Sequence, residues 1–110
     1  MESCIFCKIA GGVIPTPFIY EDEEIVAFRD IQPQAPVHFL AVPRRHVASL
    51  KEAQDAQFLG RLLLAARKAA AKTGLEQYRL VINTGAEAGQ SVFHLHVHVL
   101  GGRIMAWPPG

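Results

Sequence analysis

Hydrophobic positions recur at helical spacing in two segments of the chain. Residues 3–10 carry Ile5, Phe6 and Ile9 before the stop Gly11-Gly12, which predicts a short helix. A longer helix is predicted from a cap at Asp55 to about Lys72, with Gly74 as its C-terminal signal. Its apolar face comprises Phe58, Leu59, Leu62, Leu63, Ala66 and Ala69 or Ala70.

Shorter apolar runs between these helices predict strands. Residues 18–20 and 25–28 flank an acidic turn and form a hairpin, and a third strand covers residues 38–42. Residues 49–52 have the spacing of a capping box and predict one turn of helix. Residues 78–83 and 93–100 add two strands around a glycine-containing loop at 84–90. Because the helices do not alternate regularly with the strands, the chain is predicted to be α+β, with a five-stranded antiparallel sheet.

The last predicted strand contains three of the five histidines at alternate positions. Successive side chains of a strand point to opposite faces, so His94, His96 and His98 should share one face over an apolar backing. Imidazole can act as acid, base, nucleophile or metal ligand near neutral pH. The preceding Gly89-Gln90-Ser91 has the character of a phosphate-facing loop, so catalysis or phosphate binding is favoured over a plain metal-binding tract.

Length and composition indicate one domain over residues 1–110, long enough to bury a single core. A formal net charge of +1 gives no broad basic surface, so we expect no nucleic-acid partner. No apolar run approaches the length of a membrane span, and residues 1–4 lack a basic segment followed by an apolar one. We therefore expect a cytoplasmic protein without membrane contact, in which Cys4-x-x-Cys7 is a metal ligand pair or a redox pair rather than a structural disulfide.

Several motifs together resemble the histidine triad superfamily, and specifically its Hint branch of purine nucleoside phosphoramidases. The resemblance covers nearly the whole chain and is carried by residues 4–9, 28–31, 33–39, 89–103 and the ending Trp107-Pro108-Pro109-Gly110. It implies a homodimer in which the sheets of two copies join. The implied reaction cleaves the P–N bond of purine nucleoside phosphoramidates, which are conjugates of AMP or GMP with an amine.

The resemblance also implies roles for the catalytic residues. His96 would attack the α-phosphorus and carry a transient nucleotidyl group, while His98 contacts the phosphate or leaving-group oxygens. Ser91 would help to protonate the departing amine, and His38 would lie beside the triad, where it can orient the nucleophile. Backbone amides near Gly89 and Gln90, together with Asn83, would hold the phosphate oxygens.

The nucleoside would be held by residues of the first third of the chain. Asp30 corresponds to a carboxylate that accepts hydrogen bonds from both ribose hydroxyls. The residues that resemble the walls around the purine base are Ile5, Phe6, Ile9, Phe28 and Ile31. Each of the five would otherwise be an ordinary core residue, and composition does not distinguish the two roles.

Other histidine triad proteins bind structural zinc through two cysteines and two histidines. Here the corresponding residues are Cys4, Cys7, His46 and His94, a donor set suited to tetrahedral Zn²⁺. The other interpretation is a pair of reduced cysteines without metal. Catalysis itself should need no metal, because the nucleophile is a protein atom.

Two rival functions remain at this point. The same histidine could serve a dinucleoside polyphosphate hydrolase or a nucleotidyl transferase, although Ser91 and the Trp107 ending favour the Hint branch. Alternatively, the chain is a nucleotide-binding interaction module in which catalysis is incidental. A turnover comparison of adenosine phosphoramidate with diadenosine polyphosphate, using the wild type and His96→Ala, bears most directly on these alternatives.

Overall fold

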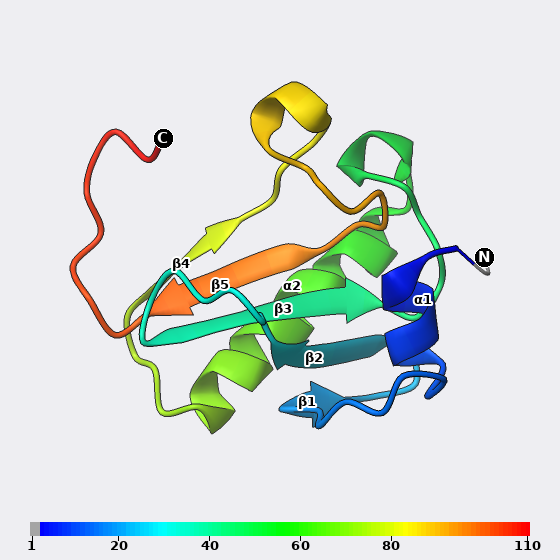
Figure 1. The fold of residues 1–110 in the computed structure, drawn as a ribbon, viewed down its shortest axis with the longest axis horizontal. Helices are drawn as coiled ribbons and strands as arrows, with labels where there is room; N and C mark the ends of the chain where they lie inside the picture. Colours follow the sequence, from blue (N-terminus) through cyan, green and yellow to red (C-terminus); the bar gives the residue numbers. More distant parts are fainter. Residues whose placement is uncertain (1–2) are drawn as a thin grey trace.

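A computed structural model describes residues 3–110; Met1 and Glu2, which enter the expectation about an N-terminal leader, lie outside the described residues. Five antiparallel strands form one sheet in the order β1-β2-β3-β5-β4, which confirms the predicted α+β class (Figure 1). The elements are α1 (Ile5–Ala10), β1 (Tyr20–Glu21), β2 (Ile25–Arg29), β3 (Val37–Pro43), η1 (Leu50–Glu52), α2 (Ala56–Lys72), β4 (Tyr78–Val81), η2 (Ala86–Ala88) and β5 (Val97–Gly101).

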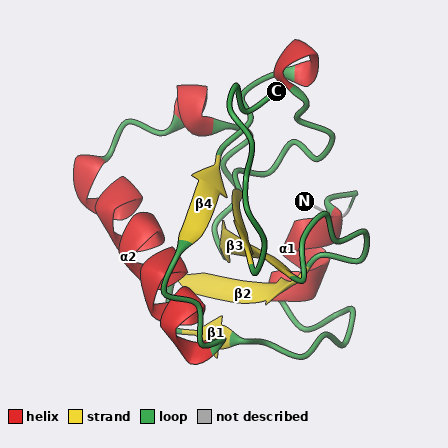
Figure 2. Cartoon of the chain, turned by 90° about the vertical axis from the view of Figure 1, so that its left-hand side faces the viewer, coloured by secondary structure: helices red, strands yellow, loops and turns green. Residues whose placement is uncertain are grey.

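The two helices cover opposite faces of the sheet (Figure 2). On β2, Ile25 and Ala27 face the core beneath α2, while Val26 and Phe28 face a second core that includes Phe6 of α1. The same division continues on β3, which is also buried on both faces. This arrangement explains why the central strands read as unbroken apolar runs rather than alternating ones.

The long helix begins at its predicted cap. The Asp55 carboxylate accepts hydrogen bonds from the backbone N–H groups of Gln57 at 2.9 Å and Phe58 at 3.3 Å. The predicted apolar face is wrong at Leu63, which is 44% exposed, whereas Ala65 is buried. Among the described residues, no helix combines the length and the hydropathy needed to cross a membrane.

Three predicted strands are shorter than expected or shifted. The first strand of the hairpin is Tyr20–Glu21 rather than residues 18–20, although the Ile19 N–H still donates to the Ala27 carbonyl at 2.8 Å. Strand β4 ends at Val81, two residues before Asn83, and β5 begins at Val97 rather than at residue 93. These boundaries coincide with the last pairs of the sheet: Val81 of β4 pairs with His98, and Val97 of β5 pairs with Ala41 of β3.

The prediction that three histidines lie on one strand is therefore wrong: only His98 is in β5. The His94–His96 segment leaves the ladder because it bonds elsewhere: the Leu95 N–H donates to the Val47 carbonyl at 2.6 Å, and the His94 ring contacts the Pro43 carbonyl. The alternation of faces nevertheless persists, since Leu95 packs in the core beneath α2 with Val97 and Val99.

Candidate active site and metal-binding cluster

Strands β3 and β5 bring His38 and His98 together. His98 lies opposite Leu40 and His38 lies opposite Leu100, so the two histidines are diagonal neighbours on one face of the sheet. His38 Nε2 is 2.9 Å from His98 Nδ1. Asp30, directly after β2, places its Oδ2 atom 3.4 Å from His38 Nε2 and 3.9 Å from His98 Nδ1. We call Asp30, His38 and His98 the relay cluster.

Hydrogen bonds fix the proton positions in the relay cluster. The backbone N–H of Gln34 donates to His38 Nδ1 at 2.9 Å, so a neutral His38 carries its proton on Nε2. That proton faces His98 Nδ1, which must then accept, leaving the proton of a neutral His98 on Nε2. Burial, reinforced by His96 and His38, lowers the pKa of His98 to about 4, so this ring is neutral at pH 7.

His96 holds the opposite tautomer. Its Nδ1–H donates to the backbone carbonyl of His94 at 2.8 Å, so the lone pair of the neutral ring is on Nε2. Burial lowers the pKa of His96 below its ordinary value, and the side chain is almost fully enclosed. The Phe6 ring meets it edge-on at 5.1 Å between centroids, and the His98 ring lies 5.0 Å away. A neutral imidazole with an available Nε2 lone pair is a competent nucleophile.

The Cys-x-x-Cys motif meets two histidines from distant segments. Cys4 caps α1, its sulfur accepting the Cys7 N–H at 3.3 Å, and both cysteines are free thiols. Cys4 Sγ is 3.2 Å from His94 Nδ1, and Cys7 Sγ is 3.4 Å from His46 Nδ1. The four donor atoms of this Cys₂His₂ cluster all lie within 4.8 Å of one another.

The Cys₂His₂ cluster has the donor set of a metal site. His94 Nε2 donates to the Pro43 carbonyl at 2.7 Å, so its Nδ1 lone pair faces the two thiols. Burial, followed by the hydrogen bond with Cys4, raises the pKa of the Cys7 thiol above its ordinary value. Two thiolates and two imidazole lone pairs converging on one point suit a tetrahedral Zn²⁺ ion.

The glycine-containing loop brings Asn83 beside Gly89. Gly89 adopts φ +100°, a left-handed conformation that favours glycine, and the Asn83 amide lies against it. The Gln90 side chain is buried and anchors the loop through the Gly85 N–H and the Ala48 carbonyl. Ser91 is exposed and lines a cavity of about 470 Å³ together with Cys4, Ile5 and His46. Ser91 and the Cys₂His₂ cluster therefore border the same cavity.

The five residues expected around the purine divide into two groups. Phe6, Ile9 and Phe28 are buried and pack in the core under α1, with the Phe6 and Phe28 rings 5.6 Å apart. Ile5 is 46% exposed and Ile31 is 93% exposed. The two exposed side chains line different cavities, Ile5 with Ser91 and Ile31 with Phe18 and Lys72, so the structure does not gather the five residues around one hollow.

Backbone groups that the sequence did not reveal orient a histidine in each cluster. In the relay cluster, the Gln34 N–H sets the tautomer of His38, and the Gln34 carbonyl accepts from Arg103 Nε at 3.0 Å. In the Cys₂His₂ cluster, the Pro43 carbonyl accepts from His94 and orients its ring. Main-chain groups are present at every residue, so no side-chain motif could have identified them.

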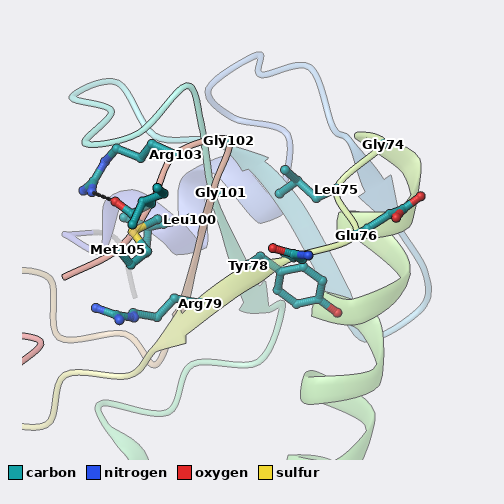
Figure 3. Close-up of a pocket in the computed structure, with 12 residues that line it drawn as sticks. Gly74, Leu75, Glu76, Tyr78, Arg79, Leu100, Gly101, Gly102, Arg103 and Met105 are labelled. Carbon is teal, nitrogen blue, oxygen red and sulfur yellow. Dashed lines mark hydrogen bonds between the residues drawn. The ribbon is translucent and has the colours of Figure 1, made fainter. Parts of the chain in front are cut away.

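A separate hollow of about 760 Å³ lies at the other end of β4 and β5 (Figure 3). Its walls come from residues 74–79 and 100–105, and it contains none of the predicted site residues. The Arg103 guanidinium, which lines it, donates to the Ile104 carbonyl at 3.1 Å. The chemistry-bearing side chains are thus concentrated at the two histidine clusters, away from this hollow.

Comparison with known proteins agrees with this geometry. The family described as "HIT domain" matches residues 11–105. An uncharacterized HIT-like protein of Synechocystis is 52% identical, covering 99% of this chain and 98% of its own length. The crystal structure of a HIT family hydrolase from Legionella pneumophila has a TM-score of 0.93 at 48% identity, covering 98% of this chain and all of that one. A hypothetical histidine triad nucleotide-binding protein from Sulfolobus tokodaii has a TM-score of 0.78 at 34% identity, over 88% of this chain and 67% of that one.

Proposed function

The chain belongs to the HIT domain family, and on that premise we propose that it is a hydrolase of purine nucleoside phosphoramidates that works through a nucleotidyl-histidine intermediate. The observation that carries this proposal is the pair of opposite tautomers at neighbouring rings. His96 offers a bare Nε2, and His98 offers an N–H at the equivalent position. A nucleophile beside a hydrogen-bond donor suits attack on a phosphorus atom whose oxygens carry negative charge.

In the first step His96 Nε2 attacks the α-phosphorus, and the P–N bond breaks as the N–P bond forms. The leaving nitrogen keeps the electron pair of the broken bond and takes the Ser91 hydroxyl proton, which solvent replaces. His98 Nε2–H donates to a phosphate oxygen while His38 holds the other ring nitrogen of His98. The backbone amides near Gly89 and Gln90, with Asn83, are proposed to hold the remaining phosphate oxygens.

In the second step water attacks the phosphorus and His96 leaves with the electron pair of the N–P bond. The proton lost by water passes to solvent or to the departing ring, and a nucleoside monophosphate is released. Neutral imidazole is both an adequate nucleophile and a good leaving group, so two moderate barriers replace one high barrier. The buried, uncharged state of His96 at pH 7 supports both roles.

Specificity for a ribonucleotide is proposed to rest on Asp30 and the apolar residues near it. Asp30 is only partly buried and keeps one oxygen, Oδ1, on the Gln32 N–H at 2.8 Å. Its other oxygen, Oδ2, faces His38, so ribose hydroxyls would approach a carboxylate that is already oriented. Ile5 and Ile31 are the exposed members of the proposed purine-binding set, and Phe6, Ile9 and Phe28 are its buried members.

Turnover of adenosine 5′-phosphoramidate and of a diadenosine polyphosphate by the wild type and by His96→Ala tests the proposal. We expect the wild type to prefer the phosphoramidate and the variant to lose turnover while still binding AMP. Preference for the polyphosphate would favour the rival hydrolase. Nucleotide binding without wild-type turnover of either substrate would favour an interaction module.

We also propose that the Cys₂His₂ cluster holds structural zinc. Cys4, Cys7, His46 and His94 would be its four ligands, with both histidines using Nδ1. When bound, Zn²⁺ supplies a cross-link between α1 and two distant segments, and four protein ligands leave no open position for a catalytic water. Elemental analysis of protein purified without a chelator or a metal-affinity tag should give one zinc per chain.

A homodimer through the β4 edge completes the proposal. Within residues 3–110, β4 pairs with β5 on one side and presents its other edge to solvent, with Tyr78 36% exposed and Leu80 38% exposed. Leu63 and Leu64 of α2 are also about half exposed, and unpaired edges are normally covered or charged. Joining two such edges would create one continuous sheet. Light scattering should give twice the chain mass, and Leu80→Lys should give a monomer.

A further inference from the structure

We infer that the Cys₂His₂ cluster positions the nucleophile His96 as well as fastening the N-terminal helix; this inference rests on the proposed function. The first observation is that His96 lies outside the sheet. Strand β5 begins at Val97, and its last pair on β3 is Ala41 with Val97, so no strand ladder holds His96. The ring of a nucleophile outside regular structure needs other contacts to keep its direction.

Those contacts lead directly to the cluster through His94. The His94 carbonyl accepts the His96 Nδ1–H at 2.8 Å, and this hydrogen bond places the lone pair on Nε2. His94 in turn has both ring nitrogens engaged, Nε2 on the Pro43 carbonyl at 2.7 Å and Nδ1 beside Cys4 Sγ at 3.2 Å. With its ring fully buried and held at both ends, His94 has little freedom to rotate its backbone carbonyl away from His96.

A second connection runs through the helix that carries the cysteines. Phe6 lies between Cys4 and Cys7 in sequence, and its ring is edge-on to His94 at 5.9 Å and to His96 at 5.1 Å. A shift of α1 would therefore move Phe6 against His96. Fixing Cys4 and Cys7 to His46 and His94 fixes this contact too.

A third contact ties the same segment to the other ligand. The Leu95 N–H donates to the carbonyl of Val47, the neighbour of His46, at 2.6 Å. The segment 94–96 is thus connected to the cysteine ligands through the His94 ring and to the His46 segment through the Leu95 N–H. His94 and Phe6 are positioning residues in this account, because they act on the reaction through His96.

The test compares zinc-loaded wild type, chelator-treated wild type and His46→Asn. Two quantities are measured below the melting temperature: the ring tautomer of His96 by ¹⁵N NMR, and the rate of nucleotidyl transfer to the protein at saturating adenosine 5′-phosphoramidate. We expect His96 to be a single Nδ1–H tautomer in the loaded protein. In the other two samples it should become a mixture, and transfer should slow about tenfold or more, the scale of losses when supporting contacts are removed.

Ile19→Ala is the matched control: Ile19 packs against the core beneath α2 beside the edge strand β1, so the substitution lowers stability away from the Cys₂His₂ cluster and from residues 94–96. It should keep the His96 tautomer and the transfer rate of the wild type. A zinc-free protein with the wild-type tautomer and transfer rate would overturn the inference, as would loss of both in Ile19→Ala. If the zinc-loaded wild type forms no nucleotidyl-protein at all, the proposed function fails, while the NMR comparison still decides the positioning role.

Discussion

The two histidine clusters use the same side chain for opposite purposes. In the Cys₂His₂ cluster, His46 and His94 direct Nδ1 at two thiols, with no carboxylate among its members. In the relay cluster, His38 and His98 bond to each other beside the carboxylate of Asp30. The first arrangement directs lone pairs at one point and suits a cation. In the second, His38 donates a hydrogen bond to His98, which fixes the tautomer of His98. His96 lies between the clusters and takes its tautomer from the first and its ring neighbour from the second.

Removing the two thiols of the Cys₂His₂ cluster should produce the largest effect, a loss of zinc and of stability. Cys4→Ser, Cys7→Ser should lose zinc and become less stable by roughly 3 kcal/mol or more, because metal binding contributes directly to folding. Thermal melting with and without chelator measures this. The chelator should lower the melting temperature of the wild type and leave that of the double variant unchanged. Equal melting temperatures for both proteins, or substoichiometric zinc in the wild type, would leave the cysteines as reduced thiols.

Breaking the hydrogen bond inside the relay cluster should have the next largest effect. His38→Leu removes the donor to His98 Nδ1 and should cut kcat by about 10- to 100-fold, because leaving a buried acceptor without its partner costs about 1–3 kcal/mol. His38→Gln keeps an N–H donor and should recover part of the rate. Equal loss in the two variants would mean that His38 contributes packing rather than a proton position.

Asp30 tests whether the relay cluster also contacts the sugar. Asp30→Asn should weaken ribonucleotide binding by about 1–3 kcal/mol, the range for hydrogen bonds to a charged group. Calorimetry with AMP and with its 2′,3′-dideoxy analogue separates the sugar from the rest of the nucleotide. If the variant loses equal affinity for both ligands, Asp30 does not bind ribose.

The smallest expected effect is a pH dependence of stability. Burial lowers the pKa of His98 to about 4, below the ordinary value of 6.5, so between these values the unfolded chain binds more protons than the folded one. Stability is therefore full above pH 6.5 and decreases as pH falls toward 4. Urea unfolding measures the free energy of unfolding at pH 7 and at pH 5. The decrease between the two pH values should be smaller in His98→Asn than in the wild type by on the order of 1 kcal/mol. Identical drops would place the titration elsewhere.

The elements and the main pattern of burial were predictable because they depend on local spacing. The cap at Asp55, the hairpin and the five-strand sheet all follow from short-range patterns and are confirmed. The start of β5 was not predictable, because it depends on the hydrogen bond from the Leu95 N–H to the Val47 carbonyl, a partner distant in sequence. The roles proposed for Ser91 and Asn83 stay predictions, as does the cytoplasmic location.

The site residues stay predictions, and the contacts among them could not be predicted from the sequence. The resemblance placed His38 near the triad to orient the nucleophile, while the contact in the structure runs from His38 to His98. The tautomers depend on the Gln34 N–H and on the His94 carbonyl, and backbone groups carry no signature in a sequence. The proton positions of the site therefore had to come from the three-dimensional structure.

The central claim is that His96, and neither of its neighbours in the triad, receives the nucleotidyl group. Wild-type protein mixed with adenosine 5′-phosphoramidate, denatured in base within milliseconds to seconds and digested for mass spectrometry, tests it directly. The account predicts an adenylyl mass on the peptide containing residues 94–98, localised by fragmentation to His96 and missing from His96→Ala. An adduct on His98 or His94, or turnover that proceeds with no adduct at any time point, would contradict it.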